Sequence, residues 1–199
     1  MSQSDDTQGL SPVRIDIPLE IRLYVIQLLQ QTLACTVDLR SQLKQACWNV
    51  KGHDLVLLQA LFATMATELD AHTDLVAERL VVLGGVARGT ARTAATHSRL
   101  PEYPGAIMDG DAHVLALAEC FASYATALRA DIAYATEVED AGSAALYTDI
   151  SRGVDQRLGF LEAYLHRDGA RIEPTRQDGS QAARQDGSQA ARQDGRRAE

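Results

Sequence analysis

The sequence predicts an all-α protein, a four-helix bundle, and three observations carry that prediction. Hydrophobic residues make up 46% of the chain and aromatic residues only 5%, which favours helices over a β-sandwich. Apolar residues recur every three or four positions along four long segments. Glycine or proline interrupts that pattern between the segments. The 199 residues suffice for one domain with a sizeable core.

The first helix is predicted from Pro18 to about Asn49, because proline is tolerated in a first turn and apolar residues follow at helical spacing. Gly52 breaks the pattern. Asp54 is a residue type that caps helices, so we expect the second helix to start there and to end at Gly84-Gly85.

A long connection follows the second helix, over residues 86–108, and contains two prolines and two glycines. A connection of this length usually carries a short helix or makes contacts of its own. A third helix is predicted from about 109–111 to just before Gly142, and a fourth from about Ser143 to His166. Four helices with one long connection in the middle have the ferritin-like topology.

Both ends of the chain are predicted to be flexible arms around the bundle. We assign residues 1–17 to an N-terminal arm, 18–168 to the bundle and 169–199 to a low-complexity tail. The tail repeats RQDGSQAA from Arg176 and Arg184 and starts a third copy at Arg192. Such repeats bury too little apolar surface to offset the entropy lost on ordering, so the prediction is disorder.

The net charge of −8 argues against a general nucleic-acid-binding protein, because affinity for phosphate depends on clustered lysine and arginine. Three widely spaced cysteines do not indicate a disulfide framework. No stretch has the pattern of a signal peptide or of a membrane span. We therefore expect a cytoplasmic protein that does not associate with membranes.

Three carboxylates, Asp70, Asp74 and Glu78, lie at i, i+4 and i+8 on one face of the second predicted helix. They repel one another unless cations or partner charges compensate, and carboxylate oxygens suit hard metals and ferrous iron. The alternative interpretation is a solvated acidic face with Arg79 nearby.

The residues around this face make the chain resemble the Dps family of mini-ferritins. The matching pieces are WNVKG at 48–52, Leu61-Phe62, Asp74, AERL at 77–80, LGG at 83–85, SRLPEYP at 98–104 and VDQRLGFLEAYL at 154–165. The resemblance implies a homo-oligomeric cage, a dodecamer, that binds ferrous iron between paired subunits. Such a cage oxidises the iron as a ferroxidase, stores it, and so protects against peroxide stress.

The resemblance also implies a metal site made of two histidines, two aspartates and a glutamate. Asp74 and Glu78 match the last two ligands, whereas Cys47, Gln59 and Ala63 stand where the other three belong. Glutamine offers a neutral carbonyl oxygen and alanine offers no ligand.

We therefore predict an altered or weakened iron site, with another divalent metal such as zinc as an alternative occupant. Its predicted ligands are Asp74, Glu78, Cys47, Gln59 and, as a substitute from the corner between the first two helices, His53. The Cys47 thiolate would be a soft ligand or a target of peroxide. The alternative for Cys47 is a small buried hydrophobic residue beside Trp48.

A second implied feature is an acidic three-fold pore near the junction of the third and fourth helices. Glu139, Asp140 and Asp149 are the predicted pore residues, because acids around a narrow opening concentrate cations. The alternative is a helix end with solvated charges.

Two functions stay open on the sequence. The favoured one is an iron-handling cage, and the other is a non-catalytic structural or DNA-associated cage with a vestigial metal site. DNA binding is not favoured, because Lys44 and Lys51 are the only lysines and the N-terminal arm carries Asp5 and Asp6. The arginines of the tail keep that alternative open.

Overall fold

A computed structural model describes residues 10–167 and contains five helices in that range. Their bounds are α1 Leu19–Asn49, α2 Leu55–Val82, α3 Ala91–His97, α4 Gly110–Glu137 and α5 Ala141–Leu165. The prediction of an all-α bundle with a long crossover is confirmed, and the crossover carries the short helix α3. The predicted N-terminal arm up to residue 9, and the predicted tail, lie outside the described residues.

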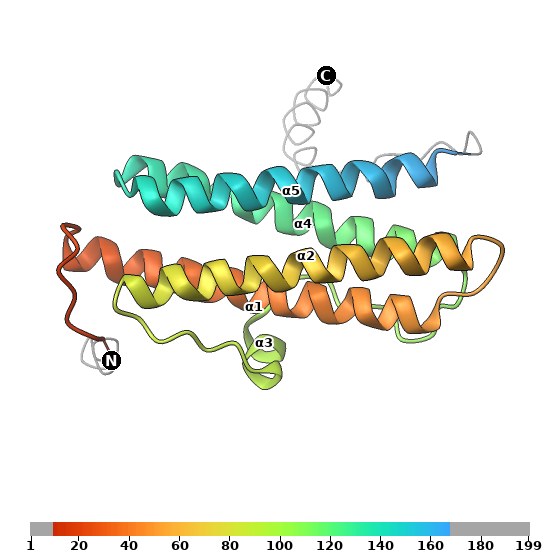
Figure 1. The fold of residues 1–199 in the computed structure, drawn as a ribbon, viewed down its shortest axis with the longest axis horizontal. Coiled ribbons are helices and arrows are strands. Elements are labelled where there is room, and N and C mark those ends of the chain that lie inside the picture. Colours follow the sequence, from red (N-terminus) through yellow and green to blue (C-terminus); the bar gives the residue numbers. More distant parts are fainter. Residues whose placement is uncertain (1–9, 168–199) are drawn as a thin grey trace, which may run out of the picture.

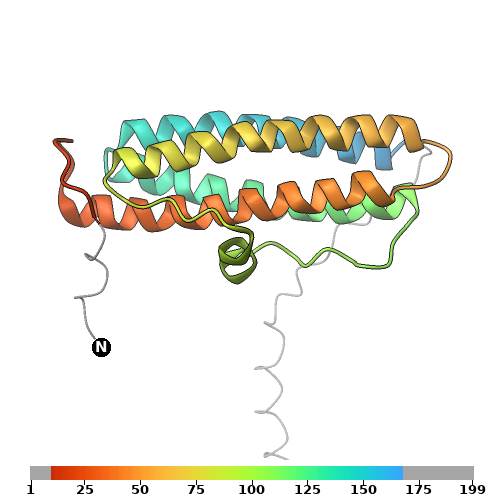
Figure 2. The ribbon, with the colours of Figure 1, turned by 60° about the horizontal axis from the view of Figure 1, so that its bottom comes forward.

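The four long helices form two antiparallel hairpins, α1 with α2 and α4 with α5, stacked side by side (Figure 1). The crossover returns the chain along the whole length of the bundle, so α2 and α4 run in the same direction. It follows the α1 side, and α3 packs against α1 outside the bundle (Figure 2). Within the described range, no helix has both the length and the apolar composition needed to cross a membrane.

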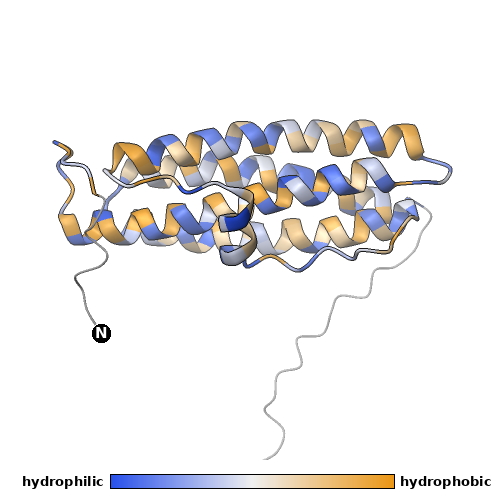
Figure 3. Ribbon diagram, turned by 90° about the horizontal axis from the view of Figure 1, so that it is seen from below, coloured by the Kyte–Doolittle hydropathy of each residue, from blue (hydrophilic) through white to orange (hydrophobic). Residues whose placement is uncertain are grey.

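The core is the shared interior of the two hairpins. Hydrophobic and hydrophilic residues alternate along each long helix, as expected when one face of each is buried (Figure 3). The largest fully buried side chains are Tyr124, Tyr147, Phe62 and Phe121, followed by leucines from α1 and α2 and Met65. Each buried phenylalanine, leucine or methionine among them stabilises the fold by about 1.5–3 kcal/mol through the apolar surface removed from water.

The structure differs from the prediction at the first residues of α1 and α2. Pro18 lies just before α1 rather than in its first turn. Asp54 precedes α2, but its carboxylate makes no capping hydrogen bond, so the prediction of a cap is wrong. The reason lies in the tertiary structure: that carboxylate accepts a hydrogen bond from the Tyr164 hydroxyl of α5 at 2.7 Å. Asp109 does cap α4, accepting from the backbone N–H groups of residues 111 and 112.

A small polar cluster interrupts the apolar core between α1 and α4. The Thr32 hydroxyl donates to the Asp131 carboxylate at 3.1 Å. The Thr36 hydroxyl donates to the carbonyl oxygen of Thr32 and lies 2.6 Å from the Tyr124 hydroxyl. Burial raises the pKa of Asp131 to about 6, and the hydrogen bond from Thr32 opposes part of that rise.

Replacing Asp131→Asn should remove a pH dependence of stability. Because the pKa of Asp131 is raised in the fold, the stability that this group contributes is present at low pH and is lost as pH rises through about 6. Urea unfolding followed by circular dichroism should therefore show the variant gaining on the wild type between pH 4.5 and pH 7.5. Parallel pH profiles for the two proteins would contradict this account.

Candidate metal centre

The corner between α1 and α2 brings two of the predicted ligands, Cys47 and Gln59, into contact. The Gln59 side-chain amide donates to the carbonyl oxygen of Cys47 at 3.2 Å. The Cys47 thiol in turn lies 3.6 Å from the carbonyl oxygen of Gln59 and donates to it. This reciprocal contact fastens the last turn of α1 to the second turn of α2, and both side chains are half-buried.

The remaining corner residues do not complete this pair into a metal site. Ala63, one turn further along α2, offers no ligand atom. The His53 side chain is fully exposed, and its Nδ1 lies 3.4 Å from a carboxylate oxygen of Asp54 rather than near Cys47. Cys47 itself is partly buried and packs against the apolar core, while its neighbour Trp48 is 72% exposed.

The two carboxylates predicted as ligands, Asp74 and Glu78, are exposed on α2. Gln59 and Asp74 are fifteen residues apart on one helix, a rise of about 22 Å. One chain therefore presents the two halves of the predicted site at distant places. In keeping with this, no three His, Cys, Asp or Glu side chains converge as a metal-binding group among residues 10–167.

Asp70, the first member of the predicted acidic face, is not free to join a metal site with them. Its carboxylate forms an ion pair with Arg40 of α1. The two side chains are 53% and 40% exposed, so this pair contributes little to stability. It does neutralise one of the three stacked charges, which leaves Asp74 and Glu78 as the acidic pair on this face.

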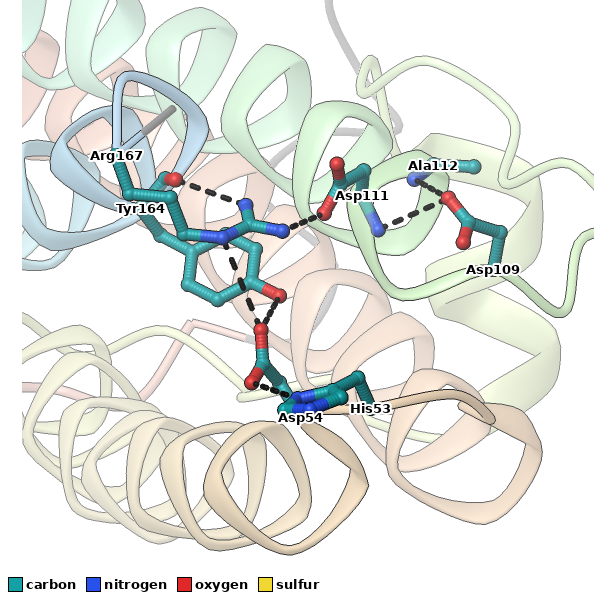
Figure 4. Close-up of polar contacts among 7 residues, drawn as sticks. All are labelled: His53, Asp54, Asp109, Asp111, Ala112, Tyr164 and Arg167. Atoms are coloured by element: carbon teal, nitrogen blue, oxygen red, sulfur yellow. Dashed lines mark hydrogen bonds and ion pairs between the residues drawn. The ribbon is translucent and has the colours of Figure 1, made fainter. Parts of the chain in front are cut away.

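A cluster of charged and aromatic side chains at the α1–α2 corner was not predicted from the sequence (Figure 4). Arg167 pairs with Asp111 at 2.8 Å, lies 3.7 Å from Asp54, and stacks over the Tyr164 ring. The hydrogen bond from Tyr164, followed by that from His53, lowers the pKa of Asp54. The cluster joins the corner to the start of α4 and the end of α5. Tyr164 is 110 positions from Asp54 and Arg167 is 56 from Asp111, so no local pattern could reveal the cluster.

The three predicted pore residues have different environments. Asp140 is buried: its carboxylate pairs with Arg79 at 2.5 Å and accepts from the backbone N–H and the hydroxyl of Ser143. It is the N-cap of α5. Glu139 is exposed, and Asp149 is exposed beside Arg152 at 3.1 Å. Asp140 therefore holds the α4–α5 junction together, and only Glu139 and Asp149 present their charges to solvent.

Comparison with known proteins agrees with this arrangement of helices. The protein-family model of the ferritin-like domain matches residues 26–169 of this sequence. A DNA protection during starvation protein from Agrobacterium fabrum is 37% identical over 150 residues, which are 75% of this chain and 93% of the relative. The chain belongs to the Dps family of ferritin-like proteins. The corner between α1 and α2 is therefore that of a Dps protein, and in it Cys47 and Gln59 are joined by hydrogen bonds.

Solved Dps structures share the fold. DpsA14 from Streptomyces coelicolor superposes with a TM-score of 0.76 at 26% identity, covering 83% of this chain and 99% of that one. Dps from Mycobacterium smegmatis gives a TM-score of 0.77 at 23% identity, covering 81% and 98%. The described helices are therefore those of a Dps subunit.

The two acids Asp140 and Asp149 should differ sharply in their effect on stability. Asp140→Ala removes the carboxylate that neutralises the largely buried Arg79, as well as a helix cap, so we expect a loss of about 3 kcal/mol. Asp149→Ala removes an exposed pair and should cost less than about 0.5 kcal/mol. Urea unfolding of the assembled protein measures both losses, and equal losses would refute the structural role of Asp140.

Thiol labelling of the native protein should separate Cys47 from the other two cysteines. Cys35 is 5% exposed and Cys120 is 2% exposed, and burial raises the pKa of Cys120 to about 12. We expect a disulfide-exchange reagent to modify Cys47 without denaturant and the other two only after unfolding. A Cys47→Ser variant is the control. If the wild type takes up no reagent in the native state, the proposal of an accessible thiol at the corner fails.

Proposed function

We propose that this Dps protein sequesters iron in a homo-oligomeric cage and that it oxidises the iron more slowly than a Dps protein with an intact ligand set. The observation that carries the proposal is the contact between Cys47 and Gln59. It occupies the Gln59 amide N–H and the Cys47 thiol with backbone partners. By removing free iron, such a cage limits its reaction with peroxide.

Assembly into an oligomer is supported by apolar side chains exposed at and near the corner. Trp48 is 72% exposed, Val56 77% and Leu57 60%. Apolar patches of this kind on a soluble subunit mark surfaces that other chains cover. Association would also allow Asp74 and Glu78 of one copy to approach the corner of another, which no single chain achieves because of their separation along α2.

Iron handling by such a site would depend mainly on two carboxylates. Asp74 and Glu78 supply the charged oxygen ligands that ferrous iron takes, and Gln59 adds a neutral carbonyl oxygen. Compared with the ligand set that the family resemblance implies, this site lacks two imidazoles and one carboxylate. The ferric product is therefore less stabilised, so oxidation slows while binding persists. Glu139 and Asp149, both exposed, are the residues that would draw cations toward the assembly at the α4–α5 end.

The test compares three forms of the protein after anaerobic loading with ferrous iron. Stopped-flow absorbance follows ferric formation after peroxide and, separately, after oxygen. We expect the wild type to be only slightly faster than Asp74→Ala/Glu78→Ala. A variant carrying Cys47→His, Gln59→His and Ala63→Asp restores the ligand types and should oxidise iron at least about tenfold faster, a barrier difference of about 1.4 kcal/mol.

Retention of iron is measured separately, by size exclusion followed by metal analysis of the protein peak. The wild type should hold many iron ions per assembly, and Asp74→Ala/Glu78→Ala should hold fewer. Fast oxidation by the wild type that the double variant loses would instead mean a rebuilt centre. If no iron travels with the assembly, the protein is a structural cage without an iron function.

A further inference from the structure

A groove on the other side of the subunit is not used by the iron chemistry. It has a volume of about 620 Å³ and is lined by residues of α1 and of the crossover. The crossover and α3 lie along this side of α1 (Figure 2). Leu23 and Ile26 give its lining an apolar part, and the exposed side chains of Tyr24 and Gln27 lie beside them. Its volume is in the range of sites that bind small molecules.

Two amide side chains of α1 fix the crossover wall of the groove. Gln30 makes both of its hydrogen bonds with the backbone of Arg88, donating to the carbonyl at 2.8 Å and accepting from the N–H at 3.0 Å. Gln31 donates to the carbonyl oxygen of His97 at 2.6 Å. The backbone positions of Arg88 and His97 are therefore set before any ligand arrives, which lowers the entropic cost of binding.

The groove is positively charged although the chain as a whole carries −8. Arg88, His97 and Arg99 line it, whereas no aspartate or glutamate does. In the part of the chain that the structure describes, the guanidinium groups of Arg88 and Arg99 form no ion pair. Arg99 does lower the pKa of Asp131, against the rise that burial causes, but Asp131 lies outside the lining and is partly buried in the bundle.

One of the two ring nitrogens of His97 is already engaged by the backbone. Nδ1 of His97 bonds to the carbonyl oxygen of Thr93 at 2.9 Å, and since a carbonyl only accepts, Nδ1 carries the proton. Nε2 is then left for a ligand, as an acceptor when the ring is neutral and as a donor when it is protonated. Cationic donors thus stand on the crossover side, and apolar, aromatic and amide groups on the α1 side.

We propose that this groove binds a small molecule that combines a phosphate with an aromatic ring, of the size of a mononucleotide. Arg88 and Arg99 are the phosphate ligands, because a planar guanidinium pairs with phosphate oxygens through two parallel hydrogen bonds. Tyr24, Leu23 and Ile26 receive the ring by apolar contact, and Gln27 offers an amide to its polar edge. The site is independent of the proposed iron function.

Calorimetry on the full-length assembly at low salt tests the site, with adenosine monophosphate and inorganic phosphate as probes. We expect the nucleotide to bind and phosphate to bind at least about tenfold more weakly, because phosphate lacks the ring. Arg88→Gln/Arg99→Gln should weaken nucleotide binding by at least about tenfold. Arg92→Gln is the matched control, an exposed arginine of the same crossover outside the lining, and should bind as the wild type does. Tyr24→Ala should weaken the nucleotide and leave phosphate unchanged.

Several results would overturn the proposal. They are no heat with the nucleotide, equal binding by Arg88→Gln/Arg99→Gln, or equal affinity for nucleotide and phosphate. A change of oligomeric state in Arg88→Gln/Arg99→Gln, seen by light scattering, would also overturn it, because the groove would then be an interface between copies of the chain. Iron retention by this variant should match the wild type, so failure of the groove and failure of the iron function are distinguishable.

Discussion

Each long helix of this subunit has one apolar face, and these four faces can be buried only against one another. That constraint makes two hairpins stack into a bundle, and it places Phe62, Phe121, Tyr124 and Tyr147 in one interior. The crossover is then obliged to run along the outside, since the interior has no room for its polar backbone. The short helix α3 and the groove beside α1 both follow from that course.

Polar side chains make different contacts at the two ends of the bundle. At the α4–α5 junction, Asp140 is held by Arg79 and Ser143, so a charged residue stabilises the turn from inside. At the α1–α2 corner, the Asp54 carboxylate accepts a hydrogen bond from Tyr164 and pairs with Arg167 instead of capping α2. In both places a carboxylate that looks free in the sequence is engaged by groups far away along the chain.

The contact between Cys47 and Gln59 at the α1–α2 corner also bears on the proposed iron site. The family resemblance implies histidines at both positions, and here the side chains of Cys47 and Gln59 hydrogen-bond to each other's backbone. These contacts engage the Cys47 thiol and the Gln59 amide N–H, whereas the side-chain carbonyl oxygen of Gln59, which would bind iron in the proposed site, is not part of them. The acidic pair Asp74 and Glu78 keeps its exposure, so under the proposed function cations are still attracted to the subunit while their oxidation slows.

The sequence by itself determined the helix content, the positions of the breaks and the crossover, because apolar periodicity and glycine or proline punctuation are local signals. It also identified Cys47 and Gln59 as replacements, through their place in a family pattern. Only the tertiary structure decided that these two touch, that Asp140 is buried while Asp149 is not, and that Arg88 and Arg99 line one groove. Those facts depend on contacts between residues distant in the chain, which helical spacing alone does not encode.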